Sequence, residues 1–241
     1  MMNNLTNLRA AILGLSIGLG ILIAGVSISR ALYKTRTAER YVSVRGLAEK
    51  EIPADQAIWP ITYKDAGDDL LRLQKQLDTN RDIIVDFLLE KGFKAEDISH
   101  SPPLITDTWA EVHYGGQTLP NTRYRIQKTV TLRSHDIQLV KQSMEKSGEL
   151  VAKGIVLSQS WENRTEFLFT GLNAIKPEMI REATLNAREA AEKFAEDSGS
   201  KIGKIRRATQ GLFTISDRDA NSPDLKIVRV VTSLEYFLVD N

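Results

Sequence analysis

The sequence predicts an α+β protein in which an N-terminal transmembrane helix precedes a largely antiparallel sheet with packed helices. Ala10–Ser29 contains no charged residue over 20 positions. The remaining chain alternates between segments with strand periodicity and segments with helix periodicity. Hairpin-like neighbours outnumber the crossovers that a parallel sheet needs, and the predicted order is β-β-α-β-β-α-β-α-β-β.

Ala10–Ser29 has the length of a bilayer span, because 20 helical residues extend roughly 30 Å. A cleaved secretory signal is the alternative, since Ser27 and Ser29 have small-x-small spacing and Arg9 forms a short basic region. The apolar region of such signals usually runs about 7 to 15 residues, which favours an uncleaved anchor. The chain then divides into a tail (1–9), a transmembrane helix (10–29), a charged juxtamembrane stalk (30–40) and an α+β domain (41–241).

Two further features of the span concern assembly and orientation. Gly14 and Gly18 form G-x-x-x-G, which permits close helix association but is also common in membrane helices generally. Four basic residues follow the span and favour a cytoplasmic location for the body of the protein, residues 41–241. The short tail that precedes the span leaves the topology open. The four basic residues are Arg30, Lys34, Arg36 and Arg40.

The first half of the body predicts two strands, Tyr41–Leu47 and Ala57–Tyr63. Apolar residues then recur every three to four positions, which predicts a helix that Gly92 ends (Leu70, Leu73, Leu77, Ile84 and Leu88). After a strand around Trp109 comes the clearest alternation in the chain. One predicted face carries Tyr124, Ile126, Val130 and Leu132, and the other Arg123, Arg125, Gln127, Thr129, Thr131 and Arg133.

The second half begins with a short helix that Asp136 caps and Gly148 ends. Strands at Ile155–Trp161 and Glu166–Phe169 lead to a long helix with Pro177 in its first turn and Gly199 at its end. Its predicted buried stripe is Ile180, Ala183, Ala187, Ala190 and Phe194. Two last strands, Ile205–Ile215 and Leu225–Val239, flank the turn-rich Asp217–Pro223.

Composition and motifs exclude several classes of function. The 241 residues are 42% hydrophobic and 26% charged with a net charge of +1, so neither disorder nor nucleic-acid binding is expected. With no cysteine, thiolate metal sites and Cys nucleophiles are excluded. His100, His113 and His135 lack metal-helix spacing, and no nucleophile motif or phosphate loop is present. We therefore predict no catalytic, cofactor-binding or metal-binding residues.

Two clusters of residues are candidate binding sites. Asp217-Arg218-Asp219-Ala220-Asn221 begins like a calcium loop, but Ser222 replaces the required glycine and Val228 the final acid, so a hairpin tip is expected. Basic side chains could bind anionic lipid or an acidic partner, or simply form a solvated face. They are Arg123, Arg125 and Arg133, then Lys201, Lys204, Arg206 and Arg207.

Three segments together carry a resemblance to a known family. They are Val42–Gly46 followed by Pro53–Ala57, then Leu88–Ile98, and then the Ala-rich Ala183–Gly203. In this order they resemble the opening strand pair, the exit from the first helix and the long Ala-rich helix of the SIMPL-domain family. Thr122–Ile126 departs from the family's aromatic-Gly strand, and Phe169–Lys176 resembles an insertion. The resemblance implies an exported envelope protein that tends to form large rings or cages and has no established enzyme activity.

These observations together predict a non-catalytic, single-pass protein of the inner (cytoplasmic) membrane with its body in the periplasm. It is expected to contact the membrane through residues 10–29 and to self-associate as a homo-oligomeric scaffold or stress-related accessory, without a cofactor or nucleic-acid partner. The alternative is a ligand-binding envelope module that captures a small or lipidic molecule. In that case Trp59, Trp109 and Trp161 would line a pocket.

Overall fold

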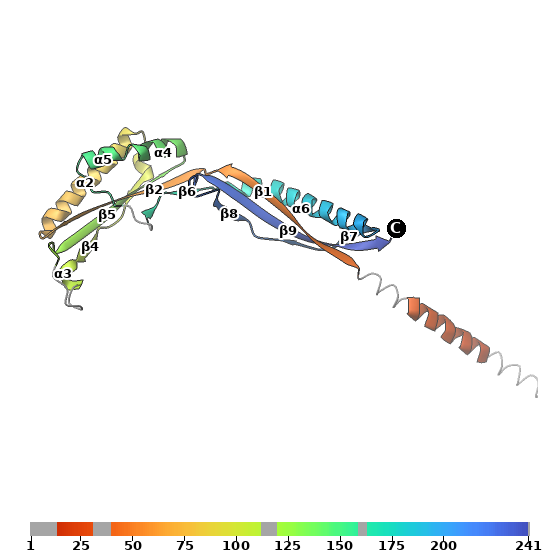
Figure 1. Cartoon of the computed structure of the whole chain (residues 1–241). Helices are drawn as coiled ribbons and strands as arrows, with labels where there is room; N and C mark the ends of the chain where they lie inside the picture. The colour runs from red at the N-terminus through yellow and green to blue at the C-terminus, as the bar shows by residue number, and fades with distance from the viewer. Residues whose placement is uncertain (1–13, 31–39, 112–119, 159–162, 241) are drawn as a thin grey trace, which may run out of the picture. The chain divides into compact units, whose positions relative to one another are not determined.

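The computed structural model describes residues 14–30, 40–111, 120–158 and 163–240 (Figure 1). The chain forms two compact units. Unit 1 contains Met1–Glu49, Pro177–Phe213 and Arg229–Asn241, and unit 2 contains Lys50–Lys176 and Thr214–Val228.

Unit 2 is built on a five-stranded sheet, whose antiparallel pairing confirms the predicted α+β class. Its order is β3-β5-β2-β6, and β4 also pairs with β5. The register between β2 and β5 places Trp59 opposite Leu132 and Tyr63 opposite Lys128. The strands are β2 (Gln56–Gly67), β3 (Ile98–His100), β4 (Leu104–Asp107), β5 (Tyr124–Ser134) and β6 (Glu166–Leu168).

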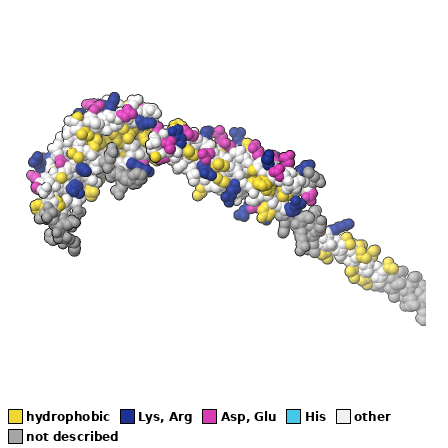
Figure 2. Space-filling view, viewed as in Figure 1, with side chains coloured by type: hydrophobic (Ala, Val, Ile, Leu, Met, Phe, Trp, Pro, Cys, Tyr) yellow, Lys and Arg dark blue, Asp and Glu magenta, His cyan; other side chains and the backbone are white. Residues whose placement is uncertain are grey.

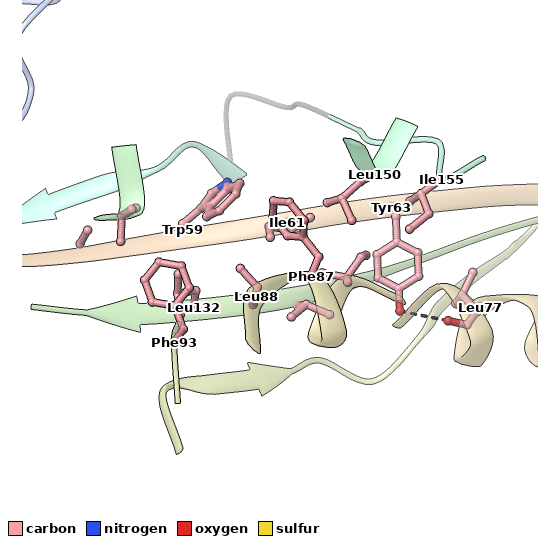
Figure 3. Close-up of a cluster of buried hydrophobic side chains, with 14 of the residues drawn as sticks. Trp59, Ile61, Tyr63, Leu77, Phe87, Leu88, Phe93, Leu132, Leu150 and Ile155 are labelled. Carbon is pink, nitrogen blue, oxygen red and sulfur yellow. Dashed lines mark hydrogen bonds between the residues drawn. The ribbon is translucent and has the colours of Figure 1, made fainter. Parts of the chain in front are cut away.

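Helices cover one face of this sheet. They are α2 (Leu70–Glu90), α4 (Ile137–Glu145) and α5 (Gly148–Ala152), and a short 3-10 turn, η1 (Ala95–Asp97), precedes β3. The core between them contains the row Trp59, Ile61 and Tyr63 of β2, packed against α2 (Figure 3). On β5, Ile126, Val130 and Leu132 are buried, so the predicted inward face of this strand is confirmed.

Local capping sets the ends of α2 and α4. The Asp136 cap and the end of the first helix at Gly92 are confirmed, and Asp69 is a cap that the sequence analysis missed. Gly148 does not end the helix that Asp136 caps, because α4 ends at Glu145 and Gly148 begins α5. The Asp69 carboxylate accepts hydrogen bonds from the amides of Leu71 and Arg72 at the start of α2, and Asp136 accepts from Leu139 in α4. Beyond α2, Gly92 has a φ of +99°, a left-handed conformation that glycine adopts without strain.

Unit 1 is a sheet covered on one side by a long helix. The sheet has the order β1-β9-β7, and β8 also pairs with β9. Its elements are β1 (Tyr41–Pro53), α6 (Leu172–Asp197), β7 (Ser200–Gln210) and most of β9 (Leu225–Asp240). β8 (Thr214–Asp217) and the first residues of β9 belong to unit 2. Val44 of β1 and Leu234 and Tyr236 of β9 pack against alanines of α6.

The buried stripe of α6 agrees with the prediction at Ala183 and Ala187 and differs at both ends, where Ile180 and Ala190 are only partly buried. Met179, Ala183, Ala187, Ala191 and Ala195 are buried, whereas Phe194 is 61% exposed. The reason is the close approach of α6 to β1. A Cβ atom on Gly46 would lie 1.8 Å from the Ala183 carbonyl oxygen and 2.4 Å from the Ala187 nitrogen. At this spacing only small side chains fit between helix and strand.

Three other predicted elements are corrected. Trp109 lies in a short helix, α3 (Thr108–Glu111), because the Asp107 carboxylate accepts from the amides of Trp109 and Ala110. Pro177 lies inside α6, which begins five residues earlier at Leu172. Within the predicted strand Ile155–Trp161, the described residues form an isolated bridge between Leu157 and Tyr63, and residues 159–162 lie outside the described part.

The predicted span Ala10–Ser29 is described in part. Residues 14–30 form a helix, whereas residues 10–13 and most of the stalk, 31–39, lie outside the described residues. Among the helices that the structure describes, none is both long enough and apolar enough to cross a membrane.

Candidate functional site

The candidate site lies where the backbone pairing along one edge of β2 is interrupted. β6 pairs with residues 56–58, and farther along the Thr62 carbonyl accepts from the Ser158 amide (2.7 Å) while the Lys64 amide donates to Val156 (3.1 Å). Even-numbered residues of β2 therefore direct their backbone groups to this edge. Pro60 lies between the two paired stretches and has no N–H to donate. The pairing is interrupted there.

A cavity of about 360 Å³ opens at this interruption. Its walls come from β2, the end of α4 and the segments around β6 and before β9, and most of the lining is apolar. The apolar wall is Trp59, Ile61, Met144, Leu157, Phe167 and Pro223. Thr62, Ser147, Ser158, Asn163, Arg164 and Thr165 add polar groups. This size and lining are those of a pocket for a small apolar molecule.

Polar contacts hold the Pro223 wall in place. The Lys141 ammonium of α4 lies 2.8 Å from the Asp224 carboxylate, and the Ala54 amide donates to the Asp224 carbonyl at 2.8 Å. The hydrogen bond from Lys141 keeps the pKa of Asp224 below its usual range. The hairpin between β8 and β9 is thereby fixed to the rest of unit 2.

A second hollow of about 490 Å³ adjoins the first, because Arg164, Thr165, Phe167 and Pro223 line both. It contains the buried Lys226, whose ammonium is ion-paired with Asp217. The cation is therefore already neutralised within the hairpin, and the more apolar cavity beside Trp59 is the better candidate site.

The three tryptophans do not meet in one pocket. Trp59 lines the cavity. Trp109 lies under Arg123, whose guanidinium is 5.7 Å from the ring centre, and its indole N–H donates to the Pro120 carbonyl at 3.1 Å. Trp161 lies outside the described residues.

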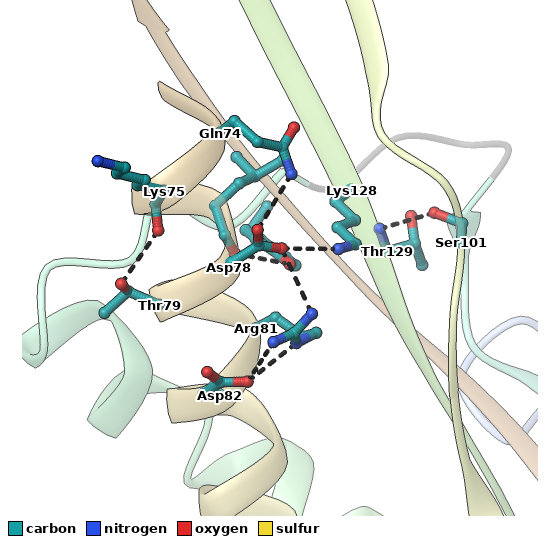
Figure 4. Close-up of polar contacts among 11 residues, drawn as sticks. Gln74, Lys75, Asp78, Thr79, Arg81, Asp82, Ser101, Lys128 and Thr129 are labelled. Carbon is teal, nitrogen blue, oxygen red and sulfur yellow. Dashed lines mark hydrogen bonds and ion pairs between the residues drawn. The ribbon is translucent and has the colours of Figure 1, made fainter. Parts of the chain in front are cut away.

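A polar cluster that the sequence analysis missed lies at the boundary of the unit 2 core (Figure 4). Lys128 occupies an inward position of β5 between Ile126 and Val130, and its side chain is only 6% exposed. Its ammonium lies 3.2 Å from Asp78 of α2, and Asp78 also accepts from Gln74 (3.2 Å) and Arg81 (3.3 Å). These bonds, from Gln74 and then Lys128, keep the pKa of Asp78 below its usual range.

This cluster has the geometry of a structural ion pair. Tyr63 lies nearby, and its hydroxyl donates to the Leu77 carbonyl at 3.2 Å while burial raises its pKa far above the ordinary value. A proton donor held in this way is poorly suited to acid–base chemistry near neutral pH. A lysine at an inward position of an otherwise apolar strand face was the available signal in the sequence.

The predicted basic residues have different surroundings. Arg123 is ion-paired with Asp107 at 3.0 Å, and this bond keeps the pKa of the Asp107 carboxyl below its usual range. Arg125 and Arg133 are exposed on the opposite face of β5 from the core. On β7, Arg206 pairs with Glu235 at 3.1 Å, while Lys201, Lys204 and Arg207 are exposed.

The histidines and the calcium-like loop also have structural surroundings. His135 donates from Nδ1 to the Asp55 carbonyl at 2.7 Å, His100 is exposed in β3, and His113 lies outside the described residues. Asp217–Asn221 forms the turn between β8 and β9, where Asp219 accepts from the Asn221 amide. In the described part of the chain, no three acidic or histidine side chains gather as a metal site.

Asp55, in the segment Pro53–Ala57, fixes the chain that enters α6. Its carboxylate accepts from the amides of Thr170 (2.8 Å) and Gly171 (3.0 Å), and its own amide donates to Leu168 (2.8 Å). We expect Asp55→Ala to lower the free energy of unfolding by about 2 kcal/mol, because two amides lose a charged acceptor. Asp55→Asn, which keeps one acceptor oxygen, should lose less in urea unfolding, and equal losses for both variants would contradict this role.

Comparison with known proteins identifies the family. None of the curated proteins matches the chain. The model of the SIMPL family, described as "Protein of unknown function (DUF541)", matches residues 42–227. This range contains the opening strand pair with Gly46 and Asp55, the helix α6 and only the first three residues of β9. Since the match covers most of the sequence, the chain belongs to the SIMPL family.

Proposed function

We propose that this protein is a non-catalytic, membrane-anchored envelope protein whose body assembles with further copies of itself into a scaffold, in a stress-related accessory role. Residues 10–29 are the proposed anchor in the inner membrane, and the body is proposed to lie in the periplasm. The uncharged stretch supports the anchor, as do the exposed apolar side chains visible along the helix of residues 14–30 (Figure 2). Resemblance to exported proteins supports the topology.

Strand β7 is the observation on which the assembly proposal depends. Among the described strands it pairs only with β9, so its other edge presents unpaired backbone groups. Residues Lys204–Gln210 are exposed on both faces of the strand, because α6 packs on β1 and β9 instead. A strand this exposed is suited to a further protein surface.

The charges of unit 1 favour a second copy as that surface. β7 carries four basic residues and no acid, whereas Glu189–Asp197 of α6 carries four acids and one lysine. Within the described residues, Lys204, Arg207, Glu189 and Glu196 make no ion pair. Basic β7 edges repel one another, so β7 of one copy is expected to contact α6 of the next. Such a head-to-tail contact repeats into rings or filaments.

Charge reversal tests this arrangement with the detergent-solubilised full chain. One variant carries Lys204→Glu and Arg207→Glu, and the other Glu189→Lys and Glu196→Lys. For each variant alone, the dissociation constant of the assembly should rise about tenfold or more, because both contact surfaces then carry charges of the same sign. An equimolar mixture should reassemble, since each reversed surface meets its complement. Native mass spectrometry measures the copy number.

Arg125→Glu with Arg133→Glu is the matched control, since it makes the same charge change on exposed strand residues of unit 2 and should leave assembly intact. A strictly monomeric wild type would overturn the scaffold proposal. If the wild type assembles and both reversed variants assemble equally well, β7 and α6 are the wrong surfaces.

A second function, capture of a small ligand, is favoured by one observation. The cavity of about 360 Å³ beside Trp59 is apolar, lies within a single unit and is open at the interrupted edge of β2. Self-association and ligand capture use different units of the chain and are compatible.

A further inference from the structure

The cavity beside Trp59 has features that define its ligand. Arg164 is the only charged residue that lines it, among the described residues, and no acidic side chain is present. Apolar side chains from β2, α4 and β6 form the wall, so a charged ligand would lose hydration without a partner deep in the cavity. The wall therefore selects an uncharged, largely apolar molecule.

Trp59 adds a directional polar group. Trp59 is only 7% exposed, and within the described part of the chain its indole N–H has no acceptor. Buried tryptophans usually donate this hydrogen bond. Among the described residues, only the Thr232 hydroxyl is both fully enclosed and without a hydrogen-bond partner. The unbonded indole nitrogen of Trp59 is therefore not fully enclosed, and solvent can reach it. Figure 3 draws the indole nitrogen at the end of the ring that points away from the ribbon of β2.

The groups that β2 presents at the opening of the cavity also limit which hydrogen bonds a ligand can make. Pro60 cannot donate, and the alternation along β2 directs its carbonyl to the interrupted edge. The hydroxyl of Thr62 is bonded to that of Thr129 at 2.8 Å. The indole N–H of Trp59 is therefore the donor that β2 offers to a ligand beside the apolar wall, in addition to the polar side chains that the other segments contribute.

We propose that this cavity binds a compact, uncharged aromatic or aliphatic molecule with a carbonyl-type oxygen, which accepts a hydrogen bond from Trp59 Nε1. This inference rests on the ligand-capture function above and adds the chemical class of the ligand. The volume of about 360 Å³ is at the small end of ligand pockets, which fits a single ring with a short substituent.

Two probes of nearly equal shape test the hydrogen bond. Acetophenone has a carbonyl oxygen where α-methylstyrene has a methylene group. The full chain, labelled with ¹⁵N on its tryptophan indoles, is titrated with each probe in the same detergent, and Trp59→Phe identifies the Trp59 resonance by its loss. Acetophenone should shift the Trp59 indole N–H resonance downfield. The Trp109 resonance is the internal control, because its N–H already donates to Pro120 outside the cavity.

Affinities from saturation-transfer NMR complete the test. Trp59→Phe should weaken acetophenone binding about fivefold, the effect of one net hydrogen bond, and α-methylstyrene binding less than twofold. Comparing each probe between wild type and variant removes the difference in how the probes partition into micelles. Failure of both probes to bind would overturn ligand capture itself. Binding of both with no change at Trp59, or with equal losses in the variant, would leave ligand capture standing and overturn the carbonyl inference.

Discussion

Gly46→Ala is expected to lower the free energy of unfolding of unit 1 by about 3 kcal/mol, the upper part of the range for overpacked sites. The added Cβ would lie 1.8 Å from the Ala183 carbonyl oxygen, 2.4 Å from the Ala187 nitrogen and 2.8 Å from the Ala187 Cβ. The first two atoms belong to the backbone of α6 and cannot rotate away. The whole helix would have to move off β1, which separates its alanines from Val44, Leu234 and Tyr236.

Urea unfolding measures the total loss, and native-state hydrogen exchange of the α6 amides localises it to unit 1. Gly148→Ala is the matched control. Nothing lies within 4 Å of a Cβ at Gly148, which begins α5, so this change should be neutral or stabilise by a few tenths of a kcal/mol. Ala187→Gly should fail to rescue Gly46→Ala, because it removes only the least severe of the three contacts. A Gly46→Ala protein as stable as the wild type would show that α6 does not pack this closely.

The packing of α6 also shows why sequence periodicity predicts helices better than it predicts their buried faces. Phe194 and Ala190 were expected in the buried stripe because a hydrophobic side chain at helical spacing favours the core. The structure buries Ala191 and Ala195 instead, since a strand with Gly46 at this distance admits only small side chains. The sequence shows Gly46 and the alanines of the helix, but no local pattern indicates that Gly46 packs against Ala183.

Other differences have the same origin in tertiary or capping interactions. The alternation in residues 124–134 correctly separates core from solvent, because a strand has a period of two wherever one face is buried. It also places Lys128 on the core side, but it does not reveal the partner of Lys128, which is Asp78 on a helix 50 residues earlier. Trp109 has a strand-like neighbourhood, but Asp107 caps a short helix there. At the candidate site, the alternative prediction of a ligand pocket named Trp59 but grouped it with Trp109, which does not line the cavity. The interruption at Pro60 that opens the cavity follows from the pairing of β2 with two separate segments.

Asp78→Asn is expected to lower the free energy of unfolding by about 2 kcal/mol at pH 7, because the Lys128 ammonium then remains buried without an opposite charge. The effect is below the range for fully buried pairs, since the Asp78 side chain is 41% exposed and water screens it. Lys128→Met is the informative partner variant. It removes the buried charge and leaves Asp78 with Gln74, Arg81 and solvent, so its cost should be small or even negative. The double variant should resemble Lys128→Met alone, which a double-mutant cycle in urea measures.

The pH dependence gives an independent readout of the same pair. The hydrogen bonds from Gln74 and Lys128 depress the folded-state pKa of Asp78, so the native state favours the ionised carboxylate more than the unfolded state does. The stability from this group is complete above its unfolded pKa, near 4, and is lost as the pH falls through the lower folded value. The difference in stability between wild type and Asp78→Asn should therefore shrink below about pH 4. A difference that stays constant from pH 7 to pH 3 would mean that the Asp78 charge does not stabilise Lys128, and the loss in Asp78→Asn would then come from packing alone.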